Sequence, residues 1–218
     1  MFVKVNGIDM YYEKCGEGRP LVMVHCNSMD HKIFKPAIKI LSQHFTVYAV
    51  DSRDHGKSTK VKTIHYADMV QDMYEFITSL QIEKPIFYGF SDGGIVGLML
   101  AAKYPDLLSQ LIVSGASVNV DSNKSWVQFF FKLGAFFYPT DKMKLMLREP
   151  NITDEEFKAI KVPVCVTCGS HDLIKQSHSE HIAATVPDGK LDVFKGKGHT
   201  GYILYKKDIA KYILENVK

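Results

Sequence analysis

The chain has 218 residues, of which 46% are hydrophobic and 23% charged, with a formal net charge of +3. These values are ordinary for a globular protein with a sizeable core, and the charge is too small to indicate nucleic-acid binding. Four scattered cysteines do not suggest a disulfide framework, and no apolar run approaches the ~20 residues that span a bilayer. We therefore expect one cytoplasmic domain over residues 1–218, a monomer or homodimer, with no membrane or nucleic-acid partner.

The first predicted element is a β-hairpin. Phe2–Val5 and Ile8–Tyr12 flank Asn6-Gly7, a dipeptide typical of a tight turn between antiparallel strands. Two continuous apolar runs, Leu21–Val24 and Phe45–Val50, then predict strands that are buried on both faces.

From there, helical and strand patterns alternate along the chain. Helical spacing covers 33–41, 66–80, 94–103, 176–186 and 205–216, and further short strands are expected at 86–88, 111–114, 162–168 and 191–194. Alternation of this kind predicts an α/β fold with a mostly parallel central sheet and helices on both faces. In such sheets, ligands bind beyond the carboxyl ends of the strands.

The strand at 86–88 leads into Gly89-Phe90-Ser91-Asp92-Gly93 and then a helix. Gly-x-Ser-x-Gly between a strand and a helix is typical of a nucleophile elbow, a sharp turn that presents the serine hydroxyl above the sheet. Glycines flank the serine because the backbone before it approaches the helix after it too closely for a Cβ. Ser91 is the predicted nucleophile, and the Asp92 N–H would stabilise an oxyanion.

Two further strands end in residues that could activate this serine. Asp172 follows the strand at 162–168, and His199 follows the strand at 191–194. An imidazole can accept the serine proton, and a buried carboxylate can orient the imidazole and stabilise its charged form. Asp121, which follows the strand ending at Ser114, is an alternative position for the acid. No metal site is expected, because His178 and His181 have no third ligand at a suitable spacing.

With these motifs, nearly the whole chain resembles the α/β-hydrolase fold family, and most of all its small bacterial serine esterases with a short cap. The resemblance rests on His25-Cys26-Asn27, on residues 51–58, and on the motifs around Ser91, Asp172 and His199. It implies that Asn27 gives the second oxyanion N–H and that no cofactor is needed. The chain has Cys26 and Asp54 where the family usually has glycine.

The resemblance also implies a small helical cap, formed by an insertion at about residues 116–160. This segment is rich in aromatic residues, which suggests an acyl or aryl group packed beneath it. Trp126, Phe130 and Phe137 are the predicted substrate-pocket residues. The insertion contains no arginine pair for a charged substrate, so small and largely apolar carboxylic esters are favoured.

The sequence therefore predicts a serine hydrolase that cleaves esters through an acyl-enzyme intermediate. Two alternatives stay open. The same triad could act on lactones, thioesters or the carbon–carbon bond of a diketone, because the shape of the pocket selects among these. The fold could also serve a non-catalytic ligand receptor.

Overall fold

The computed structural model describes the backbone of residues 1–217 and the side chains of all of these except Val120 and Phe131. Within this part, a sheet of eight strands has the order β1-β2-β4-β3-β5-β6-β7-β8. The strands are β1 Phe2–Val5, β2 Ile8–Cys15, β3 Arg19–Val24, β4 Phe45–Val50, β5 Ile86–Phe90, β6 Gln110–Ser114, β7 Val164–His171 and β8 Gly189–Gly198. β1 and β2 pair antiparallel, as do β2 and β4, whereas the pairings from β4 through β8 are parallel. The predicted mostly parallel α/β sheet is confirmed.

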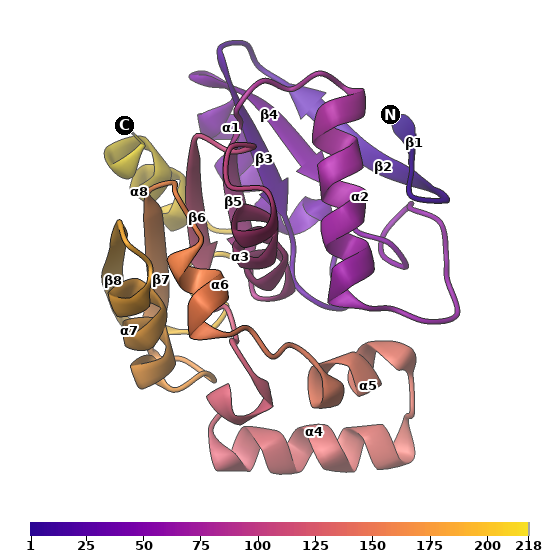
Figure 1. The fold of residues 1–218 in the computed structure, drawn as a ribbon, viewed down its shortest axis with the longest axis vertical. Coiled ribbons are helices and arrows are strands. Elements are labelled where there is room, and N and C mark those ends of the chain that lie inside the picture. The colour runs from indigo at the N-terminus through magenta and orange to yellow at the C-terminus, as the bar shows by residue number, and fades with distance from the viewer. Residues whose placement is uncertain (218) are drawn as a thin grey trace.

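Helices cover both faces of this sheet (Figure 1). One face carries α2 Tyr66–Ser79, α3 Asp92–Lys103, α6 Asp154–Lys158 and α7 Gln176–Thr185, and the other carries α1 Lys35–Leu41 and α8 Asp208–Asn216. Side chains alternate between the faces of a strand. Val22 and Val24 of β3 accordingly enter one core, and Leu21 and Met23 enter the other. Burial on both faces explains why these strands are continuous apolar runs.

The N-terminal hairpin forms as predicted. Asn6 and Gly7 connect β1 to β2 with φ angles of 39° and 79°, and Val5 pairs with Ile8 across the turn. The Asn6 side chain also donates a hydrogen bond to Oδ1 of Asp72 on α2, at 3.0 Å. The turn is thereby tied to the helix that covers the sheet.

The last helix begins three residues later than predicted. The pattern suggested a helix from Tyr205, but α8 starts at Asp208. Tyr205 has a φ of 54°, which lies outside the right-handed helical region, so the helix cannot include it. No described helix is both long and apolar enough to cross a membrane.

The insertion between β6 and β7 forms short helices. They are the 3₁₀ turn η2 Val120–Ser122, then α4 Ser125–Phe137 and α5 Asp141–Arg148, followed by α6. α4 and α5 pack on each other at the lower end of Figure 1, away from the sheet, whereas α6 packs against α3. We call α4 and α5 the cap.

Candidate active site

Ser91 occupies a strained turn between β5 and α3. Its φ and ψ angles are 52° and −111°, an unusual conformation for a residue with a side chain. Glycine is required at positions 89 and 93 because the surrounding backbone leaves no room for a Cβ atom. A Cβ on Gly89 would lie 2.1 Å from the Gly93 carbonyl oxygen, and one on Gly93 would lie 2.2 Å from the Val24 carbonyl oxygen. The local geometry is a sharp strand-to-helix turn, which is what a nucleophile elbow requires.

His199 and Asp172 come together at the carboxyl ends of β8 and β7. The imidazole Nδ1 lies 2.6 Å from Oδ1 of Asp172, and the two side chains are 14% and 1% exposed. The ring of Phe90 packs against the imidazole with centroids 5.1 Å apart. Because Nδ1 is held by the carboxylate, Nε2 is the nitrogen left to face a substrate or a hydroxyl group.

Asp172 is held in its charged form. Burial raises the pKa of its carboxyl, but the hydrogen bond and charge of His199 and the N–H groups of Gly169 and Ile174 lower it by more, so the net pKa is below the ordinary value. The two amides lie 3.2 Å from Oδ2 and Oδ1, respectively. A charged, fixed carboxylate is suited to orienting an imidazole and stabilising its protonated form.

Ser91 and His199 line one cavity of about 420 Å³, counting the space that is open to solvent. The remaining walls come from the starts of α2 and α3, the segment after β6, the end of α5 with the residues that follow it, and the loop after Asp172. They consist of Tyr66, Asp92, Ile95, Ser117, Asn123, Met146, Glu149, Pro150, Leu173 and Ile174. Most of these wall residues could not be predicted from the sequence, because a wall built from isolated positions on several elements carries no periodic signal.

The predicted oxyanion donors lie on two elements that meet at the elbow. The Asp92 N–H belongs to the first turn of α3, where amides have no acceptor within the helix and the helix dipole is positive. Asn27 follows β3, whose Val24 carbonyl is close to Gly93. The loop around Asn27 is fixed by histidines: His25 Nε2 accepts from the Ser52 N–H at 3.1 Å, and His55 Nε2 accepts from the Ser28 N–H at 3.0 Å.

The Asp92 side chain adds an unexpected acid to the site. Burial raises the pKa of its carboxyl to about 6, although hydrogen bonds from Tyr66 and Asn27 and the charge of His199 act in the opposite direction. Its Oδ2 is buried and, among the described residues, has no hydrogen-bond partner. A carboxyl group that exchanges its proton near neutral pH therefore borders the cavity.

The two departures from the family pattern are both accommodated. Asp54 has a φ of 63°, the left-handed conformation that glycine favours and that aspartate tolerates. Cys26 has no positive φ, so a side chain there carries no backbone strain. Burial raises the pKa of the Cys26 thiol to about 12, which keeps it neutral, as expected for a small buried apolar residue.

The predicted substrate-pocket residues lie elsewhere than expected. Trp126, Phe130 and Phe137 are 55%, 59% and 63% exposed, and the cavity walls include none of them. Helical spacing shows that these rings share a face of α4, but it does not show toward which side that face is turned. The apolar cap residue at the cavity is Met146 of α5. The alternative acid, Asp121, is exposed, and His199 Nδ1 is paired with Asp172 instead.

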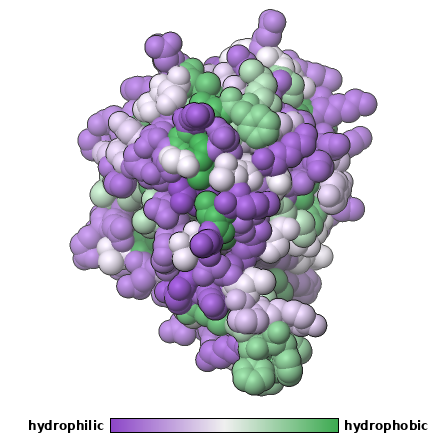
Figure 2. Space-filling model, turned by 90° about the vertical axis from the view of Figure 1, so that its right-hand side faces the viewer, coloured by the Kyte–Doolittle hydropathy of each residue, from purple (hydrophilic) through white to green (hydrophobic). Residues whose placement is uncertain are grey.

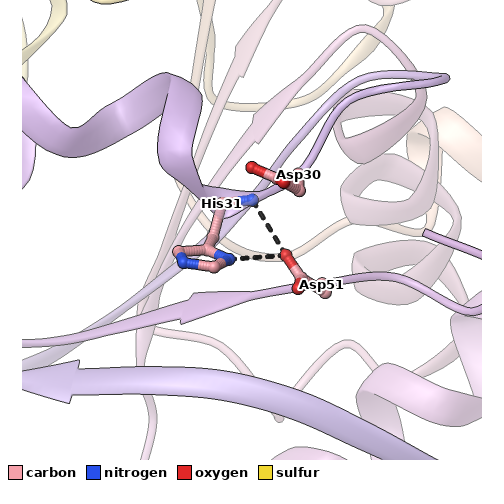
Figure 3. Close-up of side chains that lie close together, drawn as sticks. All are labelled: Asp30, His31 and Asp51. Carbon is pink, nitrogen blue, oxygen red and sulfur yellow. Dashed lines mark hydrogen bonds and ion pairs between the residues drawn. The ribbon is translucent and has the colours of Figure 1, made fainter. Parts of the chain in front are cut away.

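A second polar cluster, formed by Asp30, His31 and Asp51, has the composition of a metal site (Figure 3). Oδ1 of Asp51 accepts from the His31 backbone N–H at 2.9 Å and lies 2.7 Å from His31 Nδ1, and its Oδ2 accepts from the Lys57 N–H at 2.9 Å. His31 Nε2 lies 2.9 Å from a Glu13 carboxylate oxygen. Because these ligand atoms are engaged within the protein, the cluster is suited to joining the loop after β4 to the start of η1 (His31–Phe34).

Comparisons with known proteins show the family and the fold of the chain. A family model described as alpha/beta hydrolase fold matches residues 19–141, more than half of the chain. The human serine hydrolase BPHL is 32% identical over 132 residues, and the pimeloyl-[acyl-carrier protein] methyl ester esterase of Aliivibrio salmonicida (strain LFI1238) is 29% identical over 117 residues. These matches cover 57% and 54% of this chain but only 45% and 43% of the relatives, so they span less than half of each relative's length.

A solved structure extends the likeness to almost the entire fold. An esterase from Exiguobacterium antarcticum superposes with a TM-score of 0.82 at 20% identity, covering 98% of this chain and 97% of that one. At this identity the likeness concerns the fold alone. Together with the match of the family model, it leads to one conclusion: the chain belongs to the alpha/beta hydrolase fold family.

Proposed function

We propose that the protein is a serine hydrolase that cleaves small, largely apolar carboxylic esters. The observation that carries this proposal is the arrangement at one cavity of a strained serine and a histidine whose far nitrogen is held by a buried carboxylate. The names of the relatives lend support, since the Aliivibrio protein is called a methyl ester esterase and the Exiguobacterium protein an esterase.

In this proposal Ser91 Oγ attacks the ester carbonyl while His199 Nε2 takes its proton. The tetrahedral oxyanion is held by the N–H groups of Asn27 and Asp92, each contributing on the order of 3 kcal/mol to transition-state stabilisation. His199 then passes the proton to the leaving alcohol, and an acyl group stays on Ser91. Water, deprotonated by the same imidazole, attacks the acyl-enzyme and releases the acid. Asp172 orients His199 throughout.

The cavity argues for short acyl groups. Its enclosed part is small, since the centre of a water molecule can reach only about 50 Å³ of it. Ile95, Met146 and Leu173 supply an apolar part of its wall, while Asp92 and Glu149 make another part polar. We therefore expect acetyl to butyryl esters to be cleaved with higher kcat/KM than dodecanoyl esters.

Steady-state hydrolysis of p-nitrophenyl acetate, butyrate, octanoate and dodecanoate tests the proposal. Ser91→Ala and His199→Ala should each lower kcat by about 10⁴-fold or more, as expected when members of a catalytic unit are removed. The matched control is His171→Ala, which removes an exposed histidine next to Asp172 and should leave kcat/KM within twofold. Full activity in Ser91→Ala would refute the mechanism, and preference for the dodecanoate would refute only the chain-length proposal.

A further inference from the structure

The helix α4 presents its apolar face outward. Val127 is 2% exposed, and a Cβ on Gly134 would lie 3.2 Å from Met143 of α5, so this face of α4 is turned toward the rest of the molecule. The opposite face carries large side chains that are 41–79% exposed: Trp126, Phe129, Phe130, Leu133, Phe136 and Phe137. We call these six residues the outer stripe. An ordinary surface helix places such residues toward the core and polar ones outside, and α4 does the reverse.

The outer stripe is continuous, and its residues repeat at intervals of seven. Trp126 and Leu133, Phe129 and Phe136, and Phe130 and Phe137 each form such a pair in the sequence. This heptad spacing is the pattern that packs one helix along another. Figure 2 shows hydrophobic side chains gathered at the lower tip of the molecule, where Figure 1 places α4.

The area of the outer stripe matches that of a dimer interface. Aromatic side chains bury ~150–250 Å² each, so the exposed parts of this stripe amount to roughly 700 Å². That exceeds the ~300–600 Å² of the largest apolar patch on a typical monomer. It is close to the ~800 Å² that each partner contributes to a stable protein–protein interface.

We propose that the outer stripe is the contact surface between two copies of this chain, packed helix to helix about a twofold axis. A twofold contact needs a surface that is complementary to itself, and a single helix with one apolar stripe satisfies this condition. The surface is distinct from the cavity at Ser91, whose walls include no residue of the stripe. The proposal is therefore independent of the reaction that the cavity performs.

The charges on α4 help to distinguish a second copy of the chain from an anionic lipid surface as the partner of the outer stripe. Lys132 is the only charged residue in Ser125–Phe137, and the helix contains no carboxylate. An association driven by burial of the stripe should persist or strengthen in high salt, because salt screens the repulsion between the lysines of the two copies. Binding to anionic lipid through lysines would weaken in the same salt.

Sedimentation equilibrium of the full chain from 5 to 200 μM, in 0.15 M and 1 M NaCl, tests the proposal. We expect the weight-average mass to rise from the 24.7 kDa monomer toward twice that value in both salts. Trp126 is the only tryptophan, so its emission should shift to the blue over the same concentration range. Phe129→Ser/Phe136→Ser should weaken association by at least 100-fold and abolish the spectral shift.

The control is Phe2→Ser/Leu214→Ser, which alters exposed apolar residues on β1 and α8, and it should dimerise like the native chain. Thermal melts of each variant establish that it is folded. A native chain that stays monomeric at 200 μM overturns the proposal, and so does undiminished dimerisation of the stripe variant. Monomeric protein that floats with vesicles of phosphatidylglycerol would also overturn it, by assigning the stripe to lipid.

Discussion

Gly115 lies directly against the imidazole of His199. A Cβ there would sit 2.7 Å from Cε1 and 2.9 Å from Nδ1 of His199, and the residue has a φ of 57°. Gly115→Ala should therefore displace the imidazole from Asp172. We expect a loss of roughly 1–3 kcal/mol in unfolding free energy, from the left-handed backbone and the clash together. Hydrolysis assays should show kcat/KM lowered by about 10- to 100-fold.

Gly196 offers the matched control for that substitution. Its φ is 71°, yet a Cβ would meet no atom within 4 Å. Gly196→Ala should carry a similar backbone cost of about 1 kcal/mol and leave kcat/KM unchanged. Equal losses of activity in the two variants would show that Gly115 does not act through His199.

The Asp92 carboxyl should make stability depend on pH. Because burial raises its pKa to about 6, the folded state holds a proton that the unfolded chain releases near pH 4. Its favourable contribution is complete below about pH 4 and is lost as the pH rises toward 6. Asp92→Asn removes the ionisable group, so the variant should exceed the native chain in stability by roughly 1–3 kcal/mol at pH 8 and by much less at pH 4.5.

Urea unfolding at the two pH values measures this difference, with Asp121→Asn as the control because Asp121 is exposed. The control should track the native chain at both pH values. A gap between Asp92→Asn and the native chain that does not change with pH would contradict the assignment.

At the scale of elements, a buried ion pair joins the loop after β4 to helix α2. Arg53 Nε and Nη2 donate to the two oxygens of Asp72 at 2.6 and 2.5 Å, and the residues are 6% and 1% exposed. Removing Asp72 leaves the buried Arg53 guanidinium with Asp68 as its charged partner, 3.2 Å from Nη1, and the Asp68 side chain is 46% exposed. Asp72→Ala should therefore cost about 3–5 kcal/mol of unfolding free energy.

The double variant Arg53→Met/Asp72→Leu should cost less than Asp72→Ala, since no charge is then left behind. The exposed pair between Lys161 and Asp106, 3.6 Å apart, gives the comparison, and Asp106→Ala should change stability by less than ~1 kcal/mol. Urea titrations measure all three. A double variant as unstable as Asp72→Ala would show that the loss comes from packing instead of charge.

The outer stripe of α4 shows where sequence reasoning reaches its limit. Period-2 and period-3.6 patterns identify the faces of strands and helices, and for elements packed on the sheet the apolar face points inward. Among the elements that the structure describes, α5 is the main packing partner of α4, so the sheet does not fix the direction of the apolar face of α4. Helical spacing shows which residues share a face of α4 once the helix is known, but the direction of that face depends on how α5 packs.

At the scale of the whole molecule, the parallel sheet explains why much of the site could be predicted. Every parallel strand ends at the same edge, so polar residues that follow strands gather there whatever their separation in the sequence. Asp172 and His199 were predicted on this ground, and the structure brings them to 2.6 Å. Cavity residues such as Tyr66 and Ile95 come from helices and are identified only once the fold is known.

The account as a whole depends on Ser91 being a nucleophile activated by His199. A fluorophosphonate probe tests this directly, because the serine oxygen displaces fluoride and forms a stable phosphonyl ester. Intact mass and peptide mapping should show one adduct per chain, on Ser91. The adduct should be absent in Ser91→Ala and form at least 100-fold more slowly in His199→Ala. A folded native chain that forms no adduct, or forms it at another residue, would contradict the account.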